Sequence, residues 1–373
     1  MGSPIITDEE LEQEKKNVNV PKKSLEEIVK EGITDKDEKI IDEKIVKETE
    51  KELEKDIPSS FIEINLVSNG RIEGIPNKLH FRCYSASDAI DLNVGDDDKV
   101  KAISKVLTRL NFEKFDVSEL PVQDVLYILY KLHAEFISRT ITKKIYIDDT
   151  IEDNKLLNDE NNLEEIEIPL NGLTYAYLGK DYNDNDLGKI KIPFTIKDKQ
   201  TNESASFRFT VLNDMIMAES YCRNYFKDEF IRFADIRSAL SKINSIKDEN
   251  KQDATLDKFL NENEEKANEY YDFMIDYTKM VAKIVQAETL VSYNGKTLET
   301  LDEKWKAYED ISYSIWEKYD NVLNEYPFGI KEDMDVYLPS LKKKVHRRVG
   351  FQFNDFLHIN RQKDSDRCIV EFD

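Results

Sequence analysis

The apolar positions of the chain follow two spacings, which predict short strands in some segments and amphipathic helices in others. Apolar and polar residues alternate over residues 62–66, which is typical of a strand with one buried face. Over residues 100–110 the apolar positions step by three and four, which predicts an amphipathic helix. A similar stripe follows Pro121 over residues 125–136, and residues 140–147 are again rich in strand-forming side chains.

The second half of the chain begins with strand patterns and then becomes almost wholly helical. We expect strands over residues 167–177, 189–196 and 204–211. The apolar spacing then predicts helices with stripes over residues 230–240, 270–285 and 301–323, of which the second ends near Asn294-Gly295 and the third is stopped by residues 326–329.

Composition divides the chain into five segments, namely residues 1–58, 59–147, 148–165, 166–332 and 333–373. The first is dominated by charged residues, and we interpret it as a partly helical or disordered arm, either without a role or ordered by a partner. The second and fourth are the globular units, and an acidic, Asn-rich linker or excursion joins them. The last is a tail in which a basic run precedes several phenylalanines.

One short pattern occurs twice. Its members are Phe81, Arg82, Ser87, Asp88 and Ile90 in the first copy, and Phe207, Arg208, Asn213, Asp214 and Ile216 at the same spacing in the second. Each copy follows a strand-prone stretch, so we expect a strand, a turn capped at Ser87-Asp88 or Asn213-Asp214, and a helix. Each arginine either bridges to the acidic side of the capped helix or contacts a partner chain, and the first interpretation is favoured.

These patterns predict an α+β fold that is predominantly helical. We expect two related strand-turn-helix units with small β layers, followed by a C-terminal helical bundle.

Charge and composition exclude several classes of protein. The 373 residues include 76 acidic and 54 basic side chains, and the net charge of −22 disfavours nucleic acid as a partner. No apolar run approaches the roughly 18 residues of a membrane span, and the first residues do not resemble a secretion signal. Three widely spaced cysteines do not suggest a disulfide framework, so a reducing, cytosolic site of synthesis fits best.

The sequence contains no convincing catalytic, cofactor or metal motif. The four histidines lack zinc-site spacing. The loop that begins at Asp181 differs from a calcium-binding loop at two positions, because Asp186 replaces the required glycine and Ile192 replaces the final glutamate. Phosphate-binding glycine patterns and the Gly-x-Ser-x-Gly elbow are also missing. We expect Cys222 to be a core thiol, and we predict no enzyme activity, no catalytic residues, no cofactor and no metal.

The basic run in the last segment is the local exception to the acidic charge. Its candidate interaction residues are Lys342, Lys343, Lys344, Arg347 and Arg348, followed by Phe351 and Phe353. Such a run could touch nucleic acid, dock on the acidic face of a neighbouring subunit, or form a solvated face. The aromatic residues beside it favour docking over nucleic acid.

Residues 60–245 resemble a known family. The features that carry the resemblance are Ile75-Pro76-Asn77-Lys78 leading to Phe81-Arg82, the capped helix, Leu120-Pro121-x-x-Asp124 opening a Leu/Tyr-rich helix, and the later Phe207-Arg208 to Asp214 copy. This arrangement is similar to the T-even-type phage baseplate-hub assembly proteins, also described as tail-assembly chaperones. The cysteine pair that the family often carries after the Leu/Tyr-rich helix is absent from residues 140–149.

The resemblance implies a non-enzymatic structural or assembly protein of a contractile phage tail, acting in the baseplate or hub by protein–protein docking. Its partners would be other tail and baseplate proteins, and it would not bind a membrane. It would be found in the host cytoplasm during assembly, or in the virion tail. Two other interpretations stay open: a head-to-tail connector or ring protein of the virion, and an acidic cytosolic enzyme or regulator with a dispersed site.

Overall fold

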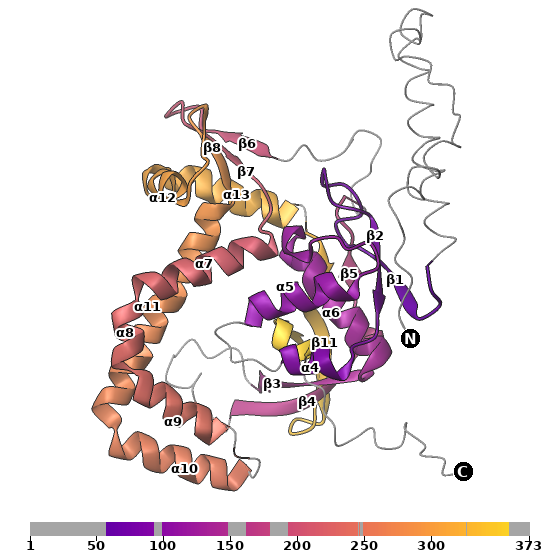
Figure 1. The fold of residues 1–373 in the computed structure, drawn as a ribbon, viewed down its shortest axis with the longest axis vertical. Coiled ribbons are helices and arrows are strands. Elements are labelled where there is room, and N and C mark those ends of the chain that lie inside the picture. The colour runs from indigo at the N-terminus through magenta and orange to yellow at the C-terminus, as the bar shows by residue number, and fades with distance from the viewer. Residues whose placement is uncertain are drawn as a thin grey trace, which may run out of the picture. The chain divides into compact units, whose positions relative to one another are not determined.

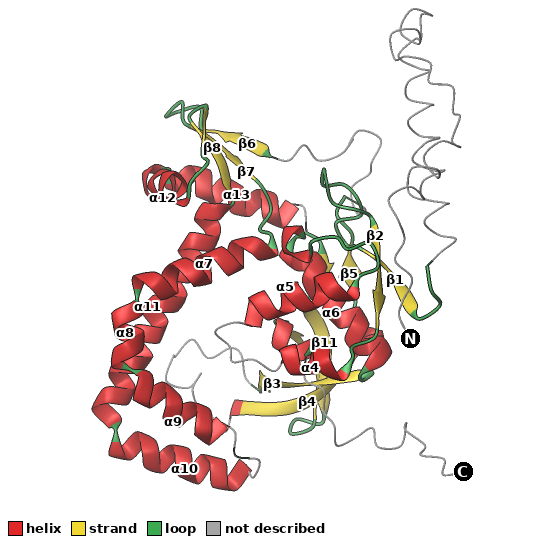
Figure 2. Ribbon diagram, in the orientation of Figure 1, coloured by secondary structure: helices red, strands yellow, loops and turns green. Residues whose placement is uncertain are grey.

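The computed structural model describes residues 57–92, 99–147, 162–179, 193–244, 246, 249–325 and 327–357. The chain divides into two units, Met1–Pro58 and Ser59–Asp373, and nearly all of the first unit, including the predicted charged arm, lies outside the described residues. The fold is α+β and mostly helical, as the sequence predicts: about 51% of the described residues are helical and 22% are in strands of small antiparallel sheets (Figures 1 and 2).

The part that precedes residue 147 contains a two-stranded sheet packed on helices. Its elements are β1 (Phe61–Asn65), β2 (Lys78–Arg82), α4 (Ala86–Leu92), α5 (Lys99–Leu110), the 3₁₀ turn η3 (Val117–Glu119), α6 (Val122–Phe136) and β3 (Thr140–Tyr146). β1 and β2 are antiparallel, and Ile62 faces Phe81 while Ile64 faces Leu79 across the pair. Because side chains alternate along a strand, these apolar residues share the buried face.

β4 (Leu163–Pro169) pairs with β3 along its whole length, from Thr140 opposite Pro169 to Tyr146 opposite Leu163. The predicted linker, residues 148–165, therefore ends inside a strand, and its remaining described residue precedes that strand. The β3–β4 pair joins the two predicted globular units. The segment is an excursion between paired strands rather than a boundary between cores.

The second part contains a four-stranded sheet and most of the helices. Its elements are the 3₁₀ turn η5 (Leu170–Gly172), β5 (Tyr175–Ala176), β6 (Phe194–Lys197), β7 (Ser204–Phe207), α7 (Leu212–Tyr225), α8 (Lys227–Arg232), α9 (Ala234–Asn244), α10 (Glu249–Glu262), α11 (Glu264–Glu288), β8 (Leu290–Tyr293), β9 (Lys296–Thr297), α12 (Leu301–Asp310) and α13 (Tyr313–Glu325). The sheet order is β6-β7-β8-β9, and all neighbours are antiparallel.

Four predictions for this part are wrong in detail. The strand expected over residues 167–177 is divided into β4, η5 and β5, and the helix expected over residues 230–240 is divided into α8 and α9. Asn294-Gly295 does not end a helix but forms the turn between β8 and β9, with φ of 48° and 81°, the conformation that a tight hairpin needs. The single helix expected around residues 301–323 is two helices, because the chain is extended at Ile311, where φ is −66° and ψ is 132°. Periodicity alone does not reveal a break that keeps the same face buried.

The last segment forms a hairpin on the main core instead of a separate tail. β10 (Gly329–Ile330) pairs with β5, β11 (Asp333–Leu338) pairs with β12 (Lys343–Arg348), and the 3₁₀ turn η6 (Phe353–Phe356) follows. Val336, Leu338, Val349, Phe351 and Phe356 are buried in the same hydrophobic cluster as β1, β2, α5 and α6. The predicted division at residue 333 therefore does not follow the packing, since the described residues 333–357 complete the core of the first part.

Two smaller clusters hold the rest together. One joins the β6–β9 sheet to α12 and α13 around Phe207, Leu290 and Ile315, and the other joins α7 to α11 around Cys222 and Ile284. Cys222 is fully buried, and burial raises its pKa to about 11, which confirms the expected core thiol.

Candidate functional site

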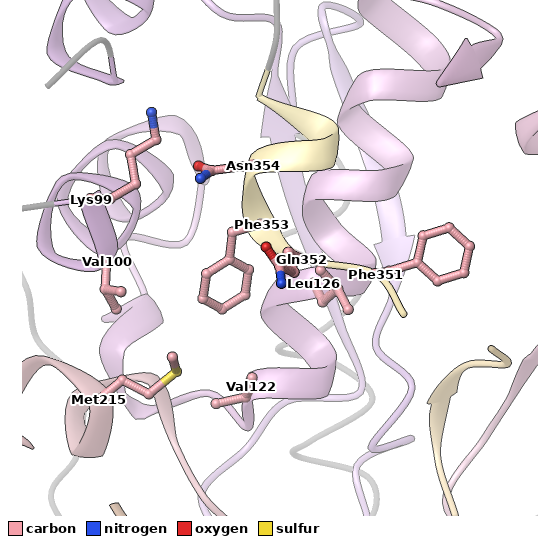
Figure 3. A pocket seen from close by; sticks show the side chains of 9 residues that line it. All are labelled: Lys99, Val100, Val122, Leu126, Met215, Phe351, Gln352, Phe353 and Asn354. Carbon is pink, nitrogen blue, oxygen red and sulfur yellow. The ribbon is translucent and has the colours of Figure 1, made fainter. Parts of the chain in front are cut away.

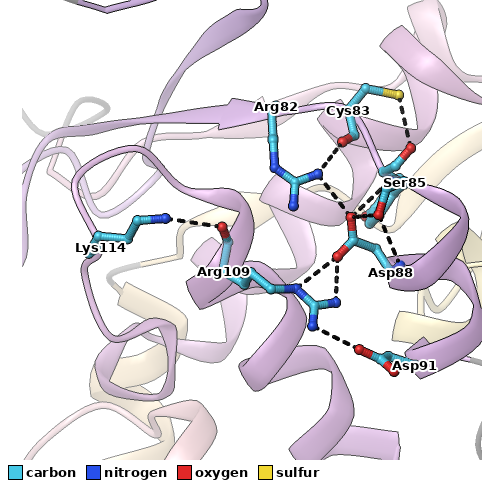
Figure 4. Close-up of polar contacts among 8 residues, drawn as sticks. Arg82, Cys83, Ser85, Asp88, Asp91, Arg109 and Lys114 are labelled. Atoms are coloured by element: carbon cyan, nitrogen blue, oxygen red, sulfur yellow. Dashed lines mark hydrogen bonds and ion pairs between the residues drawn. The ribbon is translucent and has the colours of Figure 1, made fainter. Parts of the chain in front are cut away.

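The first copy of the repeated pattern forms an ion-pair network around the buried carboxylate of Asp88 (Figure 4). Asp88 accepts hydrogen bonds from Arg82 Nη1 at 2.9 Å, from Arg109 Nε at 2.9 Å and from the backbone N–H of Ser85 at 2.8 Å. Burial alone would raise the pKa of Asp88, but the hydrogen bonds from Ser85, Arg82 and Arg109 outweigh it and hold that pKa well below its usual range. The network links the end of β2 and helix α5 to the first turn of α4.

The second copy repeats three of these contacts, and Arg208 Nη2 takes the place of Arg109 at the other carboxylate oxygen. Arg208 donates from Nη1 and Nη2 to the two oxygens of Asp214 at 2.7 and 2.6 Å, and the backbone N–H of Val211 donates to Asp214 Oδ2 at 2.9 Å. Arg208 Nη1 also donates to the carbonyl of Phe209 at 3.2 Å, as Arg82 does to the carbonyl of Cys83 at 3.0 Å. Both arginines therefore bridge to the capped helix, which confirms the favoured interpretation.

The capping residues differ from the predicted ones. Helix α4 begins at Ala86, so Ser85 occupies the N-cap and Asp88 lies at the third helical position, where it accepts from the Ser85 N–H. In the second copy Val211 is the N-cap residue, and its apolar side chain leaves Asp214 as the only polar cap partner. Ser87 and Asn213 do not cap the helices. The aspartate, three residues after the N-cap, is the functional member of each pair.

The predicted interaction residues of the last segment fall into two separate environments. Lys343, Lys344, Arg347 and Arg348 lie on β12, and Lys342 lies in the turn before it with φ of 50°. On the exposed face of the hairpin, Asp333 stands opposite Arg348, Asp335 opposite His346, and Tyr337 opposite Lys344.

Much of the basic charge of this hairpin is compensated within the chain. Arg348 Nε lies 2.9 Å from Glu332 Oε2, and His346 Nδ1 lies 3.1 Å from Asp335 Oδ1. Arg347 Nη2 donates to the carbonyl of Ile147 at 2.8 Å. The lysines at positions 342–344, at the tip of the hairpin, form no ion pair with a described residue.

Phe351 and Phe353 belong to the lining of an apolar cavity of about 430 Å³ instead of joining the basic face. The Phe353 ring lies on the same side as Val100 and Met215, whereas the Phe351 ring points away from them and stacks on Phe356 (Figure 3). The other lining residues come from three helices and the turn itself: Lys99, Val100, Val122, Leu126, Met215, Gln352 and Asn354. Lys99 stands at the start of α5, where its ammonium donates to the carbonyl of Leu92 at 2.9 Å. Asn354 Oδ1 is buried and has no hydrogen-bond partner among the described residues.

Long-range backbone pairing and a buried histidine connect the walls of the cavity. The chain around the second copy pairs with the start of α6: Val122 N–H donates to Thr210 O at 3.1 Å, and Leu212 N–H donates to Leu120 O at 3.0 Å. These bonds hold the α6 and α7 walls together. The η6 wall is fixed by His133 Nδ1, which lies 2.9 Å from the carbonyl of Phe356. Sequence patterns could not indicate this cavity, because its walls meet only through long-range pairing.

A buried carboxylate lies beneath the β1–β2 connection, at a position that the sequence pattern marks only as part of a helix start. Asp124, in the first turn of α6, is fully buried and accepts from the backbone N–H of Ser68 at 2.9 Å. Its Oδ2 has no hydrogen-bond partner among the described residues. Burial raises the pKa of Asp124 to about 6, against the opposing effect of the hydrogen bonds from Ser68.

The described residues contain no group of three or more His, Cys, Asp or Glu arranged to hold a metal ion. The calcium-like loop at residues 181–186 lies outside them. Among the helices of the described ranges, none is long and apolar enough to cross a membrane. No protein-family model matches the chain, and no curated protein or solved structure matches it. Function is therefore inferred from this geometry and from the sequence resemblance.

Proposed function

We propose that this protein is a non-enzymatic structural or assembly protein of a contractile phage tail, acting in the baseplate or hub by docking to other tail proteins. The resemblance of residues 60–245 to the baseplate-hub assembly family supports the choice of particle. The role would be exercised in the host cytoplasm during assembly, or in the virion tail.

The observation that carries the docking role is the apolar cavity at η6. Six apolar residues, Val100, Val122, Leu126, Met215, Phe351 and Phe353, contribute to the lining of about 430 Å³ of space, and Lys99 also belongs to the lining. A leucine or phenylalanine side chain of a partner fits such a space. Burying one apolar side chain contributes about 1.5–3 kcal/mol, enough to make a binding hot spot.

The buried amide oxygen of Asn354 gives the cavity directional preference. An acceptor without a partner favours an occupant that brings a hydrogen-bond donor, such as a backbone N–H or an indole N–H next to the apolar anchor. Acidic groups at the partner's rim would suit Lys99. A partner segment with an aromatic or leucine anchor flanked by acidic residues therefore matches the cavity.

The two methionines of α7 provide a matched test of the docking role. Met215 lines the cavity, whereas Met217, two positions later on the same helix, is 47% exposed and is not part of the lining. Met215→Glu places a charge in the apolar space, and we expect it to abolish co-purification with contractile-tail proteins co-expressed with this chain. Met217→Glu should leave co-purification unchanged, and equal thermal unfolding midpoints would show that both variants fold.

Equal binding by the two variants would contradict docking through the cavity. Mass spectrometry of purified particles then separates the two forms of the proposal, because a tail component is present in the virion and an assembly factor is absent. Turnover of a small molecule by the purified protein, lost on changing one side chain, would contradict the non-enzymatic role itself.

A further inference from the structure

The β1–β2 pair has one covered edge and one open edge. At the β2 edge, both main-chain groups of His80 already have hydrogen-bond partners. Its N–H donates to Glu113 Oε2 at 3.1 Å, and its carbonyl accepts from Phe112 N–H at 2.8 Å. His80 therefore directs its main-chain groups away from β1. In an antiparallel pair, its cross-strand neighbour Glu63 must do the same on the opposite side.

This alternation identifies the main-chain groups at the open edge. Leu66 N–H donates to Asn77 O at 2.8 Å, which places Leu66, Ile64 and Ile62 in the hydrogen-bonded positions facing β2. The N–H and carbonyl groups of Phe61, Glu63 and Asn65 therefore point outward. No backbone group among the described residues pairs with these three. The next outward residue, Val67, accepts from Leu178 N–H at 2.8 Å, so the edge is closed there.

A cavity of about 320 Å³ lies along this open edge (Figure 1 shows β1, β5 and α6). Four consecutive residues of β1, from Ile62 to Asn65, form one wall. Tyr175 and Tyr177, in and beside β5, form another wall, and Tyr127, Lys131 and Glu135 of α6 form the floor. The space is therefore bounded by a strand edge and by side chains, a geometry suited to an extended main chain.

The floor presents a cation without a carboxylate partner. The ammonium of Lys131 lies 5.2, 5.1 and 5.2 Å from the ring centroids of Tyr127, Tyr130 and Tyr175. Lys131 forms no ion pair with a described residue, although Glu135 is one helical turn away. Glu63, which also lines the cavity, is neutralised by Lys78 Nζ at 3.0 Å. The ammonium of Lys131 is thus the group with which an acidic ligand can form an ion pair.

We propose that the open edge of β1 binds an extended segment of another protein as an added strand, with one acidic side chain directed inward to Lys131. The main chain of the segment forms hydrogen bonds with the outward N–H and carbonyl groups of Phe61, Glu63 and Asn65, which are every second residue of β1. These bonds supply the affinity. Its inward carboxylate lies against Lys131 and the tyrosines, which supplies specificity. This surface is separate from the η6 cavity and does not depend on the tail role.

Position 63 allows the edge to be tested without disturbing the β1–β2 pair. Because the Glu63 N–H faces outward, Glu63→Pro removes an edge donor but no hydrogen bond to β2. Glu63→Thr removes the same side chain and keeps the N–H, so it is the matched control. An mRNA-displayed library of random nine-residue peptides, selected on the full chain, provides the probe.

We expect the enriched peptides to share one acidic position between β-branched residues. They should bind Glu63→Pro at least tenfold more weakly than the wild-type chain and bind Glu63→Thr equally well. Lys131→Met should remove the preference for the acidic peptide over its glutamine analogue. Met215→Glu should have no effect, so failure here and failure of the tail proposal are distinguishable.

Several results would overturn the proposal. These are the absence of enriched peptides, equal binding by the proline and threonine variants, and loss of binding in Met215→Glu alone. Dimerisation of the wild-type chain that Glu63→Pro abolishes would assign the edge to a second copy instead. If Glu63→Pro does not fold, peptides N-methylated at one amide at a time test the same strand pairing. Methylation should weaken binding at every second peptide position only, because alternate N–H groups of an added strand face β1.

Discussion

Asp124 offers the sharpest test of the described packing, because a buried carboxylate makes stability depend on pH in a predictable direction. The Asp124 side chain is fully buried, and its pKa is raised from 3.8 to about 6. In the wild-type chain its Oδ1 accepts from the N–H of Ser68 at 2.9 Å, and Asp124→Asn keeps an acceptor for that bond. The substitution removes the charge that burial disfavours and leaves the shape nearly unchanged.

The direction and the magnitude of the pH-dependent change in stability follow from proton linkage at Asp124. A carboxyl group whose pKa is higher in the folded state binds protons more tightly there, so its stabilising effect is complete below pH 3.8 and is lost as the pH rises through about 6. A difference of about two pKa units corresponds to about 3 kcal/mol at pH 8. The neutral amide of the variant carries no such penalty. The variant should therefore match the wild type near pH 4 and exceed it at pH 8, by an unfolding midpoint on the order of 5 °C.

Thermal unfolding at a series of pH values between about 4.5 and 8 checks this prediction, because the difference between variant and wild type cancels the titration of all other groups. Glu135→Gln is the control, since Glu135 lies on the same helix but is exposed. Its difference from wild type should stay small at every pH. A difference for Asp124→Asn that does not change with pH would refute the reasoning, because it would mean that Asp124 titrates as an ordinary carboxyl.

Three further predictions follow from the contacts. Asp214→Asn should lower the free energy of unfolding by about 2–3 kcal/mol, because it leaves the guanidinium of Arg208 without its charged partner. Adding Arg208→Met should recover part of this loss in denaturant titrations. Additive losses from the two substitutions would contradict the coupling between the two side chains. Phe356→Ala should cost about 3–5 kcal/mol in the same titrations, because its ring is fully buried, whereas an unattached tail would give no change. Native alkylation at pH 8 followed by mass spectrometry should label the exposed Cys83 and spare the buried Cys222; equal labelling would show that the α7–α11 cluster opens readily.

The elements that are best predicted from the sequence are those with one buried face and one solvent-exposed face. Helices α5 and α6 and strands β1 and β3 follow this rule, and their positions agree with the predictions to within a few residues. The hairpin β8–β9 escapes prediction because its four-residue strand is too short to show a period, and Asn294-Gly295 also suits a helix end. Short elements are specified by their neighbours in the sheet.

The candidate sites are predictable only in part, for a related reason. Phe351 and Phe353 stand out in the sequence for their proximity to basic residues, yet the structure uses them in the η6 cavity with residues of α5, α6 and α7. Likewise, nothing local marks Lys131 or the open edge of β1, because both depend on which strand pairs with which. A chemical motif is readable from sequence when its atoms lie within one turn or loop, and a surface assembled by long-range pairing is not.

The repeated Phe-Arg…Asp pattern shows where local information ends. Its core hydrogen bonds recur at Arg82–Asp88 and Arg208–Asp214, so the strand-turn-helix geometry is encoded within about eight residues. The surroundings differ. The first copy recruits Arg109 from α5 and starts a helix of 7 residues, whereas the second lies in a four-stranded sheet and starts a helix of 14 residues. The two copies therefore share their local hydrogen bonds but not their wider packing. The same pairing of an arginine with a buried aspartate therefore occurs in two different parts of the molecule, where it links the end of a strand to the first turn of the helix that follows.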